Sequence, residues 1–181
     1  MQELEVSSAA GPALAKDSDI LDFATVQKSD RRSTIKSDGH VYIGVMKRIL
    51  VPLDGSSESE AALREAFDIF PEAEIHAFHV VQVTEFPQDP NKSAYELAVE
   101  KGREILTRAD EIAGKHDRGI ETRMKEGHAA KTIVRYAEEN DVDHIVMGST
   151  GRSGMPRVLL GSVAESVTRR APCSVVIVRE N

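Results

Sequence analysis

Hydrophobic and polar positions alternate with two different periods from residue 47 onward, and these periods predict strands and helices in turn. Runs of apolar, β-branched or aromatic residues predict five strands, at 49–53, 73–83, 119–125, 144–147 and 174–178. Apolar residues at helical spacing predict four helices between them, the first opened by a capping box of Ser57 and Glu60. The other three are predicted at 93–116, 129–140 and 162–170, and Pro172 ends the last one.

This alternation predicts an α/β fold: an open, doubly wound parallel sheet of five strands with helices on both faces. Each crossover connection in such a sheet is right-handed. Ligands bind beyond the carboxyl ends of the strands, where the strand order reverses. Two loops are therefore the first candidates for a site, one after Leu53 and one after Met147.

The pattern is lost before residue 46. Residues 1–45 are rich in Ser, Ala, Asp and Lys and show no sustained period, which predicts a disordered N-terminal extension. Residues 46–181 then form the folded domain. The segment MKRILVPLDGS begins at Met46 and is typical of the start of a natural protein. An alternative is therefore that Met46 is the true initiator.

Composition and charge narrow the function classes. The formal net charge is −7, so the chain lacks the basic field of a general nucleic-acid or anionic-membrane surface, and neither partner is expected. No apolar stretch approaches the roughly 18 residues of a membrane span. The single cysteine, Cys173, excludes an internal disulfide, and the chain is interpreted as cytoplasmic.

A glycine-rich loop follows the fourth predicted strand. Gly148 and Gly151 stand where the chain leaves the strand, and Gly161 and Ser162 stand where the next helix begins. Glycine lets a backbone approach a phosphate closely, and a helix N-terminus attracts anions. The loop is therefore expected to fold back and hold a polyphosphate between its two ends. Arg152 adds positive charge, as does Arg157. The loop matches neither GxxxxGK[ST] nor GxGxxG, and a plain surface loop with capping glycines is the alternative interpretation.

The spacing of these residues raises a resemblance. Gly148, two residues, Gly151, nine residues and Gly161-Ser162 resemble the ATP-binding motif of the universal stress protein family. The resemblance covers about residues 46–180, including the opening Val51–Asp54 and the closing strand at 174–178. It implies a Rossmann-like sheet of the adenine-nucleotide α-hydrolase type, with strand order 3-2-1-4-5, and the ATP-binding branch of the family.

The resemblance also assigns site residues and partners. It implies an adenosine end at Pro52, Leu53, Asp54 and Val81, contacts to ribose and phosphate at Met147 and Gly148, and a phosphate cradle at Gly151, Gly161, Ser162 and Val163, beside Arg152. The ligand implied is ATP, with or without Mg²⁺. The family usually dimerises through the last strand, which here offers Val175, Ile177 and Val178. The implied function is a nucleotide-responsive stress or regulatory factor.

Several alternatives stay open at this point. Asp54 precedes Gly-Ser, so a turn or helix-capping role is the alternative to its ligand role, which the glycine-rich loop opposite favours. His76 and His79 lie three apart in a strand and point to opposite faces, so they cannot chelate together, and no Cys/His set has zinc spacing. The loop offers no lysine or evident base, which favours holding ATP over hydrolysing it. A weak ATPase and a nucleotide-free dimeric interaction module are the alternatives.

Overall fold

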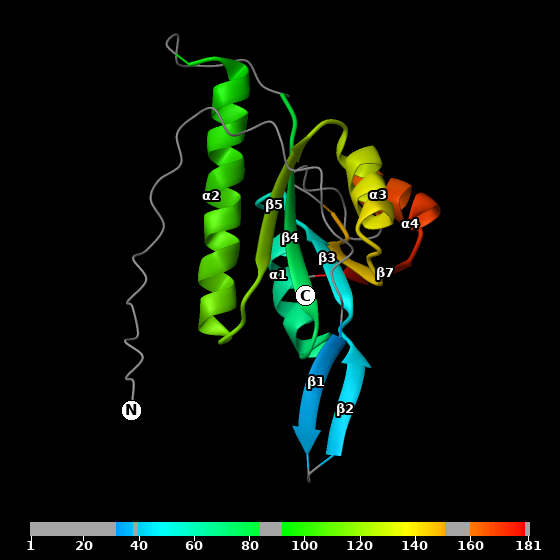
Figure 1. Ribbon diagram of the computed structural model, residues 1–181. Coiled ribbons are helices and arrows are strands. Elements are labelled where there is room, and N and C mark those ends of the chain that lie inside the picture. Colours follow the sequence, from blue (N-terminus) through cyan, green and yellow to red (C-terminus); the bar gives the residue numbers. More distant parts are fainter. Residues whose placement is uncertain (1–31, 38–39, 84–91, 151–159, 180–181) are drawn as a thin grey trace, which may run out of the picture. The chain divides into compact units, whose positions relative to one another are not determined.

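The computed structural model describes residues 32–37, 40–83, 92–150 and 160–179, which contain a five-stranded sheet (Figure 1). The strand order is β5-β4-β3-β6-β7, and every pairing is parallel. This is the predicted 3-2-1-4-5 order, counted from the first strand of the domain. The strands are β3 (Arg48–Pro52), β4 (Glu74–Val81), β5 (Glu121–Glu126), β6 (His144–Gly148) and β7 (Ser174–Val178).

Burial follows the position of each strand in the sheet. The three inner strands are almost continuously buried, because helices cover both of their faces, and their sequences are nearly uninterrupted apolar runs. The edge strands β5 and β7 are half-buried or exposed along their length. The strand order reverses between β3 and β6, so the carboxyl ends of these two strands flank the expected ligand position.

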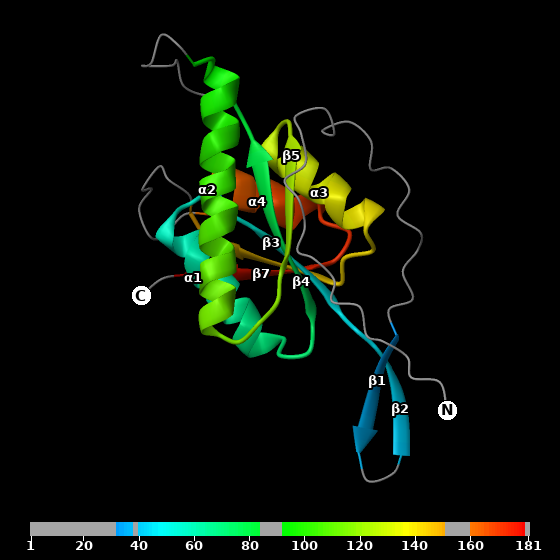
Figure 2. The same cartoon turned by 60° about the vertical axis from the view of Figure 1, so that its left-hand side comes forward.

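Two pairs of helices cover the two faces of the sheet (Figures 1 and 2). One core packs α1 and α2 against residues such as Ile49, Val51 and Ile75, and the other packs α3 and α4 against Leu50 and Phe78. Alternate residues of one strand therefore feed opposite cores. The helices are α1 (Ser57–Ile69), α2 (Ala94–Lys115), α3 (Ala129–Glu139) and α4 (Ser162–Arg170).

The helix starts correct one expectation. The prediction of a Ser57–Glu60 capping box was wrong by one residue: Ser56 is the N-cap of α1, and its side chain accepts from the Ser59 N–H. A complete capping box instead opens α2, where Ser93 and Glu96 satisfy each other's backbone N–H groups. Ser56 and Ser57 are both suitable N-cap residues, so sequence spacing alone could not show which of them begins α1.

A two-stranded antiparallel hairpin precedes the sheet in the chain. It consists of β1 (Arg32–Ser37) and β2 (His40–Val45), with Arg32 opposite Val45 and Ser37 opposite His40. The sequence pattern did not predict these strands. The boundary near residue 46 stays a prediction, and residues 1–31 of the expected disordered extension lie outside the described residues. In the described part of the chain, no helix is both long and apolar enough to cross a membrane.

Candidate functional site

The backbone at the end of β3 is held in place from β4. The Leu53 N–H donates to the Phe78 carbonyl at 2.8 Å, which extends the pairing of the two strands by one residue. The Leu53 carbonyl lies 2.8 Å from Nδ1 of the buried His79 ring. A carbonyl only accepts, so Nδ1 carries the proton and donates. His79 thus positions the backbone from which Asp54 projects, a role that the sequence did not reveal.

Asp54 forms the turn between β3 and α1. Its Oδ1 accepts from the Ser56 N–H at 3.0 Å and from the Ser56 hydroxyl at 2.6 Å. Gly55 between them has φ +83°, a conformation in which side chains are strained. The turn role considered for Asp54 is therefore confirmed, and its contact with a ribose stays a prediction.

The two ends of the glycine-rich loop meet beside β7. The Ser149 N–H donates to the Val178 carbonyl, and the Gly161 N–H donates to the Ser149 carbonyl, both at 2.8 Å. The chain therefore leaves β6 at Gly148 and returns to the same place at Gly161. This closure is what the sequence analysis expected of a loop that holds a ligand between its ends.

Helix α4 begins at this closure point with an uncapped N-terminus. Gly161 is its N-cap residue, with φ −63° and ψ 153°, and no side chain of the described residues caps the helix. Ser162 is exposed and Val163 half-buried, so the first turn of the helix is available to an anion. Glu165 is exposed and pairs with Arg169 at 3.3 Å, so it lies on the solvated face.

The remaining predicted site residues fall into three groups. Leu53, Val81 and Met147 are buried, with 4–5% of their surface exposed, and Pro52 is half-buried at the end of β3. Gly148 is the last residue of β6 and is half-buried. Gly151 and Arg152 lie outside the described residues, as does Arg157.

Glu58, in the first turn of α1, is a residue that the sequence analysis missed. A Cβ added at Gly148 would lie 2.9 Å from the Glu58 Cβ and 3.0 Å from its carbonyl carbon. The Thr150 hydroxyl also lies 3.3 Å from Glu58 Oε1 and donates to it. The sequence signal was weak, since only its place in the helix after the first strand brings Glu58 to the switch point.

A cavity of about 360 Å³ lies between α1 and α2, and Leu53 and Asp54 are among the residues that line it. Its charged lining residues include Glu60 and Arg108, which pair with each other at 3.4 Å. Among the residues that line it, none of the described loop residues at 148–150 and 160–161 occurs. The described part of its lining therefore comes from α1, α2 and the turn after β3.

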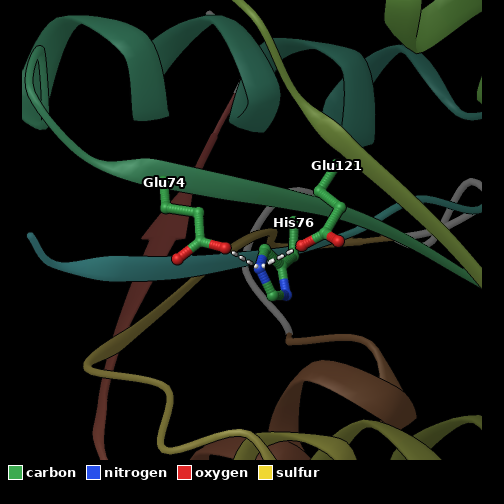
Figure 3. A group of neighbouring side chains, drawn as sticks. All are labelled: Glu74, His76 and Glu121. Carbon is green, nitrogen blue, oxygen red and sulfur yellow. Dashed lines mark hydrogen bonds and ion pairs between the residues drawn. The ribbon is translucent and has the colours of Figure 1, made fainter. Parts of the chain in front are cut away.

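The histidines of β4 behave as predicted in one respect. His76 and His79 point to opposite faces: His76 Nδ1 lies 2.8 Å from the Tyr136 hydroxyl of α3, whereas His79 lies against Gly102 of α2. His76 also lies beside Glu74 and Glu121 (Figure 3). This group joins two strands, so a search for ligand spacing along the sequence could not find it.

Comparisons with known proteins match this architecture. The family model described as the universal stress protein family matches residues 46–179. The universal stress protein MJ0531 of Methanocaldococcus jannaschii is 39% identical over 154 residues, covering 82% of this chain and 88% of that protein.

Solved structures agree with the sequence comparisons. Universal stress protein UspA from Lactobacillus plantarum is 30% identical with a TM-score of 0.61, and the match covers 74% of this chain and 97% of that one. A universal stress protein in complex with cAMP is 28% identical with a TM-score of 0.56, covering 72% of this chain and 95% of that one. The chain therefore belongs to the universal stress protein family.

Proposed function

We propose that this protein binds an adenine nucleotide, ATP in particular, between the carboxyl ends of β3 and β6. The observation that carries the proposal is the closure of the loop after β6, where the Gly161 N–H meets the Ser149 carbonyl at 2.8 Å. This closure sets the uncapped N-terminus of α4 beside the chain reversal at Gly148. A related protein, 28% identical, has been solved in complex with cAMP, which supports an adenine nucleotide as the ligand class.

Each end of the ligand has a proposed set of partners. Asp54 accepts hydrogen bonds from ribose hydroxyls, while Pro52, Leu53 and Val81 surround the adenosine. The phosphates approach Gly148 and the N–H groups of Ser162 and Val163 at the start of α4, where the helix dipole favours negative charge. Gly151 and Arg152 complete the cradle in this proposal.

The position of Glu58 favours a cation bound together with the nucleotide. Its carboxylate lies beside Thr150 and Gly148, where phosphate oxygens would arrive. A carboxylate and a polyphosphate repel each other unless a cation bridges them, and Mg²⁺ is usually bound by one or two carboxylates plus substrate phosphates. We therefore propose that ATP binds with Mg²⁺.

The proposed role is that of a nucleotide-responsive regulatory factor that holds ATP and hydrolyses it slowly or not at all. The loop from 148 to 162 contains no lysine, and it contains no histidine or carboxylate that could act as a general base for hydrolysis. Ligand binding would order the two ends of this loop together with α4, and a partner could detect that ordering. The cytoplasm is the proposed compartment.

Edge strand β7 supports a homodimer. Val175, Ile177 and Val178 are half-buried within one chain, although their side chains are apolar. An apolar edge strand invites pairing with another strand. We propose that two copies meet at this edge. A nucleotide-free dimeric module of the same fold is the second candidate, and an edge of β7 that no described strand pairs with favours it equally.

Thermal unfolding with and without Mg²⁺-ATP separates these candidates. At a ligand concentration 100-fold above Kd, binding would stabilise the protein by about 2.7 kcal/mol. Gly161→Val keeps an extended backbone that valine adopts easily, but fills the position where phosphates must approach. Gly119→Val is the matched control, since nothing lies within 4 Å of a Cβ there. An ATP shift that persists in Gly161→Val would rule out the loop as the phosphate site.

A further inference from the structure

Three potential metal ligands converge at the amino-terminal ends of β4 and β5 (Figure 3). His76 Nε2 lies 3.0 Å from Glu74 Oε1 and 2.8 Å from Glu121 Oε2. The three ligand atoms all lie within 4.8 Å of one another. Atoms bound to one tetrahedral Zn²⁺ at about 2.0–2.1 Å are separated by about 3.3 Å, so small side-chain shifts would admit the ion.

The strand register produces this convergence. Glu74 and His76 are two residues apart in β4 and therefore point to the same face. Glu121 is the direct partner of His76 across the β4–β5 pairing. The backbone of two paired strands, and not a flexible loop, therefore fixes all three ligand positions.

Two arginines orient the carboxylates of Glu74 and Glu121. Arg48 donates to Glu74 Oε2 at 3.1 Å from both Nε and Nη2, and it also donates to the Asn140 carbonyl at 2.5 Å. Arg123 pairs with Glu121 through Oε1. Each glutamate thus binds an arginine with one oxygen and presents the other to His76. Such supporting contacts hold the ligands of metal sites in place.

The imidazole is also held in a ligating orientation. His76 has 3% of its surface exposed, and its Nδ1 lies 2.8 Å from the Tyr136 hydroxyl. Burial lowers the pKa of His76 below its ordinary value, although the hydrogen bond with Glu74 opposes this shift. A neutral imidazole has one N–H, and two carboxylate oxygens compete for it at Nε2. A metal at Nε2 would move that proton to Nδ1, where the Tyr136 oxygen accepts it.

We propose that Glu74, His76 and Glu121 form a binding site for a divalent transition-metal ion of the Zn²⁺ class. One imidazole nitrogen and two carboxylate oxygens suit Zn²⁺ and leave a fourth position for water. The two arginines offset the charge of the glutamates, so they weaken the attraction for a cation while they orient its ligands. The site lies at the amino-terminal ends of the strands, whereas the glycine-rich loop follows the carboxyl end of β6.

The bound ion would stabilise the pairing of the edge strand β5 with β4. Among the strands that the structure describes, β4 is the one that pairs with β5, and Glu121 is the first residue of β5. A metal joining Glu121 to His76 would tie β5 to β4, and the Tyr136 contact would extend the connection to α3. Metal binding would therefore stabilise the fold without requiring a nucleotide.

Direct titration tests the site. The full chain, without a polyhistidine tag and freed of nucleotide, is titrated with Zn²⁺ against a chromophoric chelator, and Co²⁺ provides visible d–d bands that report coordination. Glu121→Gln keeps the shape of a half-exposed side chain and removes one anionic ligand. Glu126→Gln, at the far end of the same strand, is the matched control.

The proposal expects one Zn²⁺ per wild-type chain, roughly tenfold or more weaker binding in Glu121→Gln, and unchanged binding in Glu126→Gln. Circular dichroism shows whether both variants are folded. Wild-type protein that binds no Zn²⁺ overturns the proposal. Equal affinity in Glu121→Gln also overturns it, since the ion would then reside on surface histidines.

Discussion

At Gly148 the sheet and α1 approach each other closely beside the candidate site. Gly148→Ala would place a Cβ 2.9 Å from the Glu58 Cβ, 3.0 Å from its carbonyl carbon and 3.1 Å from its carbonyl oxygen. Ordinary van der Waals contacts begin at 3.4 Å. Two of these three atoms belong to the backbone of α1, so rotation of a side chain cannot relieve the overlap. The first turn of α1 must shift away from β6.

The expected loss of unfolding free energy follows from the kind of steric strain. Overpacking that moves backbone typically costs 1–3 kcal/mol, so we expect Gly148→Ala to lose about 2 kcal/mol of unfolding free energy. With a urea m-value of about 2 kcal/mol per molar, the unfolding midpoint falls by about 1 M. The shift would also move Glu58 relative to Thr150, so nucleotide affinity should fall in the same variant.

Urea unfolding followed by circular dichroism measures this effect, and Gly114→Ala provides a control with the opposite sign. Gly114 lies near the end of α2, and nothing surrounds a Cβ there within 4 Å. Alanine in a helix is favoured over glycine by up to about 1 kcal/mol, so this variant should gain stability. A Gly148→Ala midpoint equal to or above the wild type would refute the steric argument.

Three further predictions concern other parts of the molecule. Glu58→Gln should reduce the dependence of ATP affinity on Mg²⁺, measured by titration calorimetry with Mg²⁺ and with a chelator; an unchanged dependence would remove Glu58 from the cation site. The second prediction concerns the pH dependence of stability in metal-free protein with a chelator present. Burial lowers the pKa of His76 in the folded state, so the unfolded chain binds a proton at this residue more readily than the folded chain does. The contribution of His76 to stability should therefore be complete above pH 6.5 and should fall as the pH drops below that value. His76→Gln should flatten this dependence in urea midpoints, and an equally steep profile would contradict it. Ile177→Lys should convert a dimer to a monomer in light scattering after size exclusion, because the charge would be buried at the β7 edge; a wild-type monomer would contradict the dimer itself.

Much of the sheet could be predicted from the sequence because its strands and helices have clear periods. The last helix, 162–170, and the last strand, 174–178, were predicted with their observed bounds. Buried parallel strands are short apolar runs, and such runs stand out from the helical pattern around them. The strand order came from the family resemblance, since periodicity alone does not say which strands are neighbours.

Contacts between helices and strands were harder to predict from the sequence. The sequence indicated the closure from Gly148 to Gly161, because both ends carry glycine at a specific spacing. It did not reveal Glu58, which meets Gly148 only through the packing of α1 on β6. It also missed Glu121 beside His76, since strand register fixes that pairing. The strands at 32–37 and 40–45 were missed although Asp38-Gly39 stands in the sequence between two segments with β-branched residues, a typical hairpin signal.

The central claim is that ATP binds at the closure between β6 and α4. Isothermal titration of nucleotide-free protein with Mg²⁺-ATP tests this claim most directly, with Gly161→Val and Gly119→Val titrated alongside. The account predicts one saturable site per chain in the wild type and in Gly119→Val, and loss of binding in folded Gly161→Val. No heat of binding in the wild type, or equal affinity in Gly161→Val, would contradict it.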